Sequence, residues 1–153
     1  MAGRTVSKWV LFKVDNSAGA LTTIPVNSIS ICGLTYEEHD LTAFQDAVAG
    51  VLPGMPSAPI DIGGPWDTTV TTGSHTVLDT IYGLSVPLAL AVCFGDKAAF
   101  IPDTDWNFGI TYTAANGYLC TAYNVDPSTM MYTARFNVFP GSIIPAWSIV
   151  AFA

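Results

Sequence analysis

Apolar residues in this 153-residue chain fall in short runs separated by glycine, proline, asparagine and aspartate, a pattern typical of β-strands joined by turns. In the last long run, Tyr132, Ala134 and Phe136 share one face of a strand, and polar residues occupy the other face. The pattern predicts about seven strands, over Thr5–Val14, Leu21–Leu34, Ala58–Ile62, Ser85–Phe94, Trp106–Thr113, Gly117–Val125 and Met130–Phe139.

One segment has helical spacing instead. Val77, Leu78 and Ile81 recur at intervals of three and four residues, Ser74 precedes them as a candidate N-cap, and Gly83 follows as a terminator. These signals predict a single α-helix at about residues 74–82.

Two turn signals set the expected connections between strands. The Asn116-Gly117 pair predicts a hairpin between the strands on either side of it, and Gly63-Gly64-Pro65 is expected to end the strand before it. Together the elements predict one domain over residues 1–153, a mainly β-sandwich or β-barrel with one flanking helix and a long inter-strand loop.

The long loop is expected over residues 35–57. A connection of roughly twenty residues without a strand of its own is uncommon in a compact domain and is usually functional or disordered. This segment is too apolar to be disordered by composition. We interpret it as an ordered loop that leaves its own domain and packs against another chain, with Phe44, Val51, Leu52 and Met55 as candidate interface residues.

The composition supports assembly. Charged residues make up 11% of the chain and apolar residues 50%, whereas about 25% of residues are charged in an ordinary soluble domain. A lone domain with so few charges would expose large apolar patches, which typically mark protein–protein contact. The sequence therefore predicts obligate self-assembly.

The net charge of −7 argues against nucleic acids and anionic membranes as specific partners. Nucleic-acid binding requires clustered lysine and arginine, and the five basic residues here are scattered; anionic membranes are disfavoured for the same reason. The N-terminus has only a four-residue apolar run, Trp9–Phe12, which is too short for a signal-peptide core, and no later run reaches the length of a membrane span. We therefore expect a cytoplasmic origin. Cys32, Cys93 and Cys120 are expected to be buried free thiols, with one disulfide plus a spare thiol as the alternative.

The acidic run Glu37-Glu38-His39-Asp40 is the main candidate for chemistry. Adjacent strand residues point to opposite faces, so at most alternate members of the run converge, and we interpret it as a solvated or inter-subunit polar surface. The only histidines, His39 and His75, exclude a three-histidine metal site, and no nucleophile elbow, phosphate loop or dinucleotide fingerprint is present. We predict no enzymatic activity, no metal and no cofactor.

Several short motifs follow one another along the chain in a distinctive order. They are Trp9–Asn16, Asp40-Leu41-Thr42-Ala43-Phe44, Pro53-Gly54-Met55, Gly64-Pro65-Trp66-Asp67, His75-Thr76-Val77-Leu78 and the closing pair Gly117–Val125 and Thr133–Val138. This order resembles the tail tube proteins of long-tailed, non-contractile bacteriophages. The resemblance covers most of the chain, and the order of its motifs carries it more than any single motif. Gln45 departs from the family, which often has glycine there, and the segment after Pro140 does not align.

The resemblance implies a structural virion protein, made in the host cytoplasm, that forms hexameric rings stacked into a hollow tail tube. The implied tube encloses a tape-measure protein, conducts DNA at ejection without binding it specifically, and contacts other tail and head–tail joining proteins. The excess of carboxylates predicts an acidic or neutral lumen. Two alternatives are a capsid decoration or head–tail joining protein and a small β-sandwich domain for carbohydrate binding or adhesion.

Overall fold

The computed structural model describes residues 7–16, 19–30, 32–95, 100–113 and 115–152, which form eleven strands and one α-helix. The predicted mainly β class with one helix is confirmed, with more strands than the seven expected. After a short 3-10 turn, Ser7–Trp9, the strands form two main sheets. The five-stranded sheet has the order β11 (Ala146–Ser148), β8 (Asn107–Ile110), β7 (Leu90–Phe94), β1 (Val10–Asp15) and β2 (Leu21–Ile24). The four-stranded sheet has the order β3 (Ser28–Ile29), β6 (Ile60–Pro65), β10 (Met131–Val138) and β9 (Tyr118–Asp126).

One hydrophobic core joins the two main sheets. Phe12 of β1 and Phe136 of β10 are fully buried, and their ring centroids lie 5.4 Å apart. Tyr132 and Ala134 of β10 are buried with Phe136, which confirms the alternation predicted for this strand. None of the residues 35–57 belongs to this core. The body of the domain is therefore packed without them.

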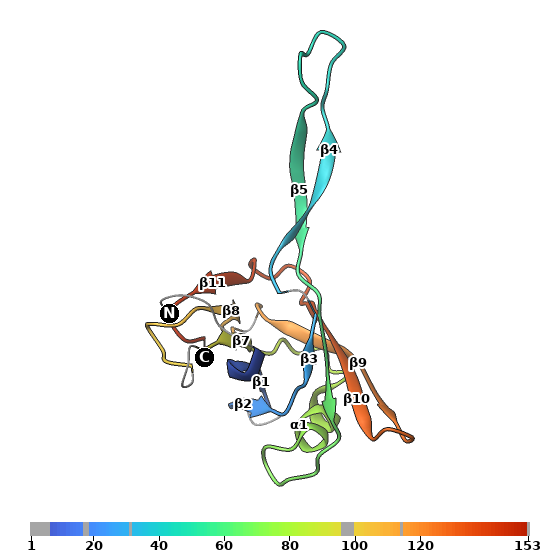
Figure 1. Ribbon diagram of the computed structural model, residues 1–153, viewed down its shortest axis with the longest axis vertical. Coiled ribbons are helices and arrows are strands. Elements are labelled where there is room, and N and C mark those ends of the chain that lie inside the picture. The colour runs from blue at the N-terminus through green and yellow to red at the C-terminus, as the bar shows by residue number, and fades with distance from the viewer. Residues whose placement is uncertain (1–6, 17–18, 31, 96–99, 114, 153) are drawn as a thin grey trace.

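Residues 35–57 form an arm that projects from the body, and the arm and helix α1 (Ser74–Ile81) lie toward opposite ends of the molecule (Figure 1). In the arm, β4 (Thr35–Asp40) pairs antiparallel with β5 (Val51–Ser57). The expected long loop is thus a β-hairpin. Acidic and proline residues are depleted in strands, so composition disfavours both segments. Mutual pairing nevertheless satisfies the backbone groups that an extended loop would leave in water.

The run expected at residues 21–34 is two strands in different sheets. Pro25 follows β2 directly, and its carbonyl accepts a hydrogen bond from the Tyr132 hydroxyl at 2.7 Å. Ile29 in the short β3 then pairs with Ile62 of β6. Proline lacks the N–H that a continuing strand would donate, so the chain changes sheets at this residue.

Neither turn signal sets the expected connection, although the chain does turn where Thr113 and Asn116 form an antiparallel bridge. β6 continues through Gly63 and Gly64 to Pro65. Gly64 lets the chain at Pro25 approach closely, because a Cβ at Gly64 would lie 2.8 Å from the carbonyl oxygen of Pro25. The Asn116-Gly117 pair does not close a hairpin of neighbouring strands, since β8 pairs with β7 and β11 whereas β9 pairs with β10. In both cases long-range packing decides the role of the glycine.

Helix α1 confirms the predicted helix, although Gly73 rather than Ser74 is its N-cap. The buried Ser74 hydroxyl instead donates to the carbonyl of Pro65 at 2.8 Å and accepts from the N–H of Asp67 at 3.0 Å. This bonding ties the helix start to the loop that precedes it. With only eight residues, α1 is too short to cross a bilayer, and the structure describes no helix that could do so.

Asp15 at the end of β1 makes stability depend on pH. Its side chain is 4% exposed and accepts a hydrogen bond from the Ala89 N–H at 2.9 Å, and burial raises the pKa of the carboxyl. As pH rises from about 3, the unfolded chain ionises first at Asp15, so folding is progressively penalised until the folded carboxyl ionises too. We expect the free energy of unfolding of Asp15→Asn, taken relative to that of the wild type, to be higher at pH 7 than at pH 3. Urea denaturation at the two pH values checks this, and an unchanged difference would contradict it.

Candidate assembly interface

The arm carries all four residues predicted to form an interface. Phe44, in the connection between β4 and β5, is fully exposed, and Met55 is 81% exposed. Val51 and Leu52 of β5 are half exposed. Met55 lies near the body, where it lines a surface hollow together with Ile143 and Ile144. These apolar side chains are therefore available to another chain.

Local hydrogen bonds give the arm tip a defined shape. The Thr42 hydroxyl accepts from the Gly50 N–H at 2.7 Å, and the Thr42 N–H donates to the Asp40 carboxylate at 2.9 Å. Asp46 accepts from the Ala43 N–H at 2.8 Å. The bonds from Thr42 lower the pKa of Asp40, so this carboxylate is charged at neutral pH. The tip is closed by its own polar groups and does not bury its apolar side chains.

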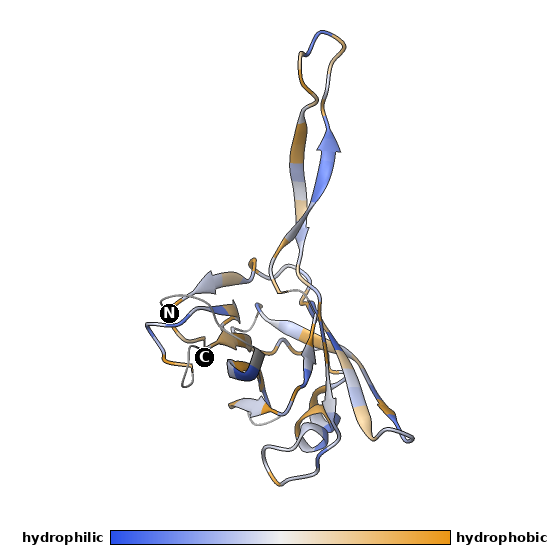
Figure 2. Cartoon of the chain, viewed as in Figure 1, coloured by the Kyte–Doolittle hydropathy of each residue, from blue (hydrophilic) through white to orange (hydrophobic). Residues whose placement is uncertain are grey.

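The two strands of the arm differ in character (Figure 2). β4 contains Glu37, Glu38 and Asp40, whereas β5 is mainly apolar. With Asp46, residues 35–57 hold four carboxylates and no lysine or arginine, a formal charge of −4 out of the chain's −7. The arm is thus an apolar and acidic element, and a surface that receives it would be apolar and basic.

The arm has one edge suited to strand addition. Leu41 donates its N–H to the carbonyl of Gly50 at 2.9 Å. Because paired residues alternate along an antiparallel ladder, the backbone groups of Glu38 and Asp40 face outward on the far edge of β4. On β5, Pro53 lies opposite Glu38 and has no N–H to offer. The edge of β4 is therefore the more open of the two.

The acidic run lies on this exposed arm, and all of its side chains are exposed. The Glu37 carboxylate is 3.7 Å from Nε2 of His39, and both side chains are largely exposed. The other histidine, His75, is in the body, where its Nδ1 is 2.8 Å from the Tyr123 hydroxyl. Among the residues that the structure describes, no three histidine, cysteine or acidic side chains gather into a metal-binding group. Cys32, Cys93 and Cys120 are free thiols, and the last two are buried.

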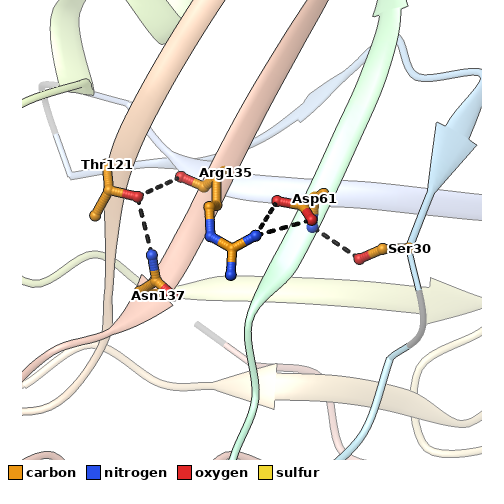
Figure 3. A network of polar contacts seen from close by, with 5 residues as sticks. All are labelled: Ser30, Asp61, Thr121, Arg135 and Asn137. Carbon is orange, nitrogen blue, oxygen red and sulfur yellow. Dashed lines mark hydrogen bonds and ion pairs between the residues drawn. The ribbon is translucent and has the colours of Figure 1, made fainter.

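The outer face of the four-stranded sheet carries a set of polar side chains joined by hydrogen bonds and an ion pair (Figure 3). Arg135 of β10 binds both carboxylate oxygens of Asp61 on β6 at 3.1 Å. Ser30 accepts from the Asp61 N–H at 2.8 Å, and Asn137 donates to the Thr121 hydroxyl at 2.9 Å. The two charges neutralise each other, so this face is polar but close to neutral.

A second exposed apolar surface lies near the end of the chain, in the segment after Pro140 that the sequence resemblance does not cover. Asn107 of β8 holds this segment by donating to the carbonyls of Ser148 and Val150 at 2.9 and 3.1 Å. Its apolar runs were visible in the sequence, but their exposure depends on the position of β11 at a sheet edge. The exposed residues are Ile143, Ile144, Trp147, Ile149 and Val150.

Comparison with solved structures finds the same fold in chains of three cryo-EM structures. A chain from the six-fold symmetrised cryo-EM baseplate of the anti-feeding prophage matches with a TM-score of 0.63 and 10% identity, covering 97% of each chain. The sheath/tube terminator structure of an extracellular contractile injection system, PVC, contains a match with a TM-score of 0.59 and 10% identity over 97% of this chain and 99% of the other. The PVC sheath–tube complex in the extended state gives 0.58 and 12% over 97% and 93%.

The chain shares its fold with components of contractile injection systems. At these identities the likeness concerns the fold alone. No protein-family model matches the sequence, and neither does any curated protein. The shared fold is compatible with the phage-tail resemblance of the sequence. Two of these solved structures come from contractile injection systems, so the likeness does not support the non-contractile class that the sequence motifs indicate.

Proposed function

We propose that this chain is the structural subunit of a hollow tube in a phage-tail-like particle, with six copies in each ring and the rings stacked. The protruding arm carries this proposal, because its apolar side chains have no partner within the chain's own core. An isolated two-stranded hairpin is marginally stable in water, so the arm gains stability by packing on a neighbouring subunit or ring. The six-fold symmetry of the anti-feeding prophage baseplate supports the number six.

The proposal covers what contractile and non-contractile tails have in common. The sequence motifs resemble non-contractile bacteriophage tails, and the similar solved structures belong to contractile systems. In a bacteriophage, the tube would enclose a tape-measure protein, and DNA would later pass through it on ejection. The role of the subunit is structural and includes no catalytic step, metal or cofactor.

The proposed lumen is acidic or neutral. Twelve carboxylates against five bases give the chain a negative balance, and the Asp61–Arg135 pair leaves one sheet face polar and nearly uncharged. Carboxylates on such a wall would repel DNA phosphates within about 8 Å at physiological salt, and uncharged polar groups would not attract them. In a cryo-EM structure of the assembled tube, we expect carboxylates and small polar groups along the channel. A channel lined mainly by the basic residues Arg4, Lys8, Lys13, Lys97 and Arg135 would refute this.

Negative-stain microscopy of the purified protein tests the proposed function. We expect rings or tubes with a central channel, and light scattering should show assembly at modest concentration. An obligate interface of this kind buries about 2,000 Å² or more. A stable monomer at high protein concentration would contradict the proposal.

A second candidate function is that of a subunit in a ring at one end of the tube. The baseplate and the sheath/tube terminator among the similar structures favour it. A subunit of such a ring would form closed rings that do not stack. The same micrographs separate the candidates, because the repeated tube subunit forms long tubes and the end component forms single rings.

A further inference from the structure

We infer that the arm of one copy docks in a groove beside β3 on the body of a second copy. The inference rests on the proposed function, because it names the surface that receives the arm. The groove has a volume of about 550 Å³ and is lined by residues from β1, β3, β7 and β11. We call it the β3 groove, and its apolar lining includes Val10, Val26, Ile29, Val92, Phe94 and Trp147.

The β3 groove lies between β3 and the strands β1, β7 and β11, and most of its lining residues are apolar. Trp147 is 47% exposed although its ring packs at 5.1 Å from Phe108 and 5.4 Å from Phe94, measured between centroids. Ile29 belongs to β3, a strand of two residues at the edge of the four-stranded sheet. Among the other apolar lining residues, Val10, Val26, Ile29 and Phe94 are partly exposed and Val92 is buried. A concave surface with partly exposed apolar side chains around one exposed tryptophan is typical of protein contact sites, so the groove suits the apolar half of the arm.

Charge complementarity selects the arm as the occupant. Lys8 is exposed at the β3 groove, and the described residues that line the groove include no aspartate or glutamate. The arm has the opposite character, with four carboxylates and no basic residue. Glu38 and Asp40 belong to β4, the strand with the more open edge, so in the proposed contact β4 lies beside Lys8. The second copy thus presents both the apolar surface and the cation that the arm lacks.

The geometry requires two copies. The arm points away from the body that carries it (Figure 1), so it cannot fold back into its own β3 groove. A contact between two different surfaces of the same chain is heterologous, and repeated heterologous contacts generate closed rings or open filaments. The proposed tube contains both kinds of contact, a closed set within each ring and an open series from ring to ring.

The native thiol Cys32 allows a direct test by crosslinking. Cys32 lines the β3 groove and is partly exposed, whereas Cys93 and Cys120 are buried. Three single variants, Phe44→Cys, Val48→Cys and Leu52→Cys, each place one thiol on the arm. Burial raises the pKa of Cys32 to about 11, so a copper–phenanthroline catalyst at mildly alkaline pH is used to drive oxidation.

We expect at least one arm variant to give a ladder of covalent oligomers on a non-reducing gel, and the ladder should disappear when Cys32→Ser is added. The matched control is Val70→Cys, whose site is 84% exposed on the loop before α1. Helix α1 lies toward the end of the molecule opposite the arm (Figure 1). It should give no ladder that depends on Cys32. Absence of such a ladder in all three arm variants would overturn the docking.

Charge reversal provides an independent test. Lys8→Glu and Glu38→Lys should each raise the concentration at half-assembly about two- to fivefold, and the double variant should restore the wild-type value. Single variants that assemble like the wild type would contradict the inference. If tubes form but no crosslink depends on Cys32, the arm docks elsewhere and the proposed function stands. If neither rings nor tubes form under any condition, the proposed function fails as well.

Discussion

Replacing Phe44 and Met55 by alanine is expected to leave a folded monomer that no longer forms tubes. Both side chains lie on the arm, and neither belongs to the hydrophobic core. Burial of one such side chain at an interface is worth roughly 1.5–3 kcal/mol. Because the same contact recurs in every subunit, the loss is repeated along the whole tube, and even a modest loss for each contact removes long assemblies.

The double variant is compared with Val70→Ala/Val86→Ala, which removes two exposed apolar side chains from loops of the body. Circular dichroism reports the fold, and light scattering with negative-stain microscopy reports assembly. The control should assemble like the wild type. Unfolding of the arm variant would show that Phe44 and Met55 stabilise their own domain, and normal tubes would show that the arm is not an interface.

Elements with strong local patterns were predictable from the sequence. Alternation along β10 identified its buried face, and the spacing of Val77, Leu78 and Ile81 identified α1. In both elements one periodic face is buried against the body, so the local pattern and the tertiary environment agree. The mainly β class follows from such patterns alone.

The connections were not predictable, because they depend on contacts between distant segments. The run around Pro25 looked like one strand, but it divides between two sheets. The Asn116-Gly117 pair has the chemistry of a tight hairpin, yet its flanking strands belong to different sheets. The arm was expected to be a loop since neither β4 nor β5 has the composition of a strand, and only their pairing makes them strands.

The candidate interface was only partly visible in the sequence. Phe44, Val51, Leu52 and Met55 stood out because an apolar segment without a predicted strand needs some partner. The β3 groove gave no such signal. Its lining combines the segment around β3 with Lys8 and residues of β1, β7 and β11, and the apolar runs among these segments read locally as parts of an ordinary core. Only the sheet order brings them to one open side.

Replacing Phe136 by alanine is expected to destabilise the fold, whereas replacing Phe44 is expected to weaken assembly and leave the fold intact. Both substitutions remove a phenylalanine side chain. Phe136 is fully buried, and its ring meets Phe12 across the two sheets at 5.4 Å. Phe→Ala in a core typically costs about 3–5 kcal/mol, and a domain of this size has only about 5–15 kcal/mol to lose. The same truncation on the exposed arm should change stability by less than about 0.5 kcal/mol.

The measurement requires a chain that does not assemble, so Phe136→Ala is added to the Phe44→Ala/Met55→Ala monomer. Urea unfolding followed by tryptophan fluorescence should show a much lower midpoint with an unchanged slope, because the folded state is weakened but unfolding exposes the same surface. A loss below about 1 kcal/mol would mean that the contact between the sheets does not hold the body together. With the expected loss, the core between the sheets carries the stability of the fold, and the arm is left free to serve assembly.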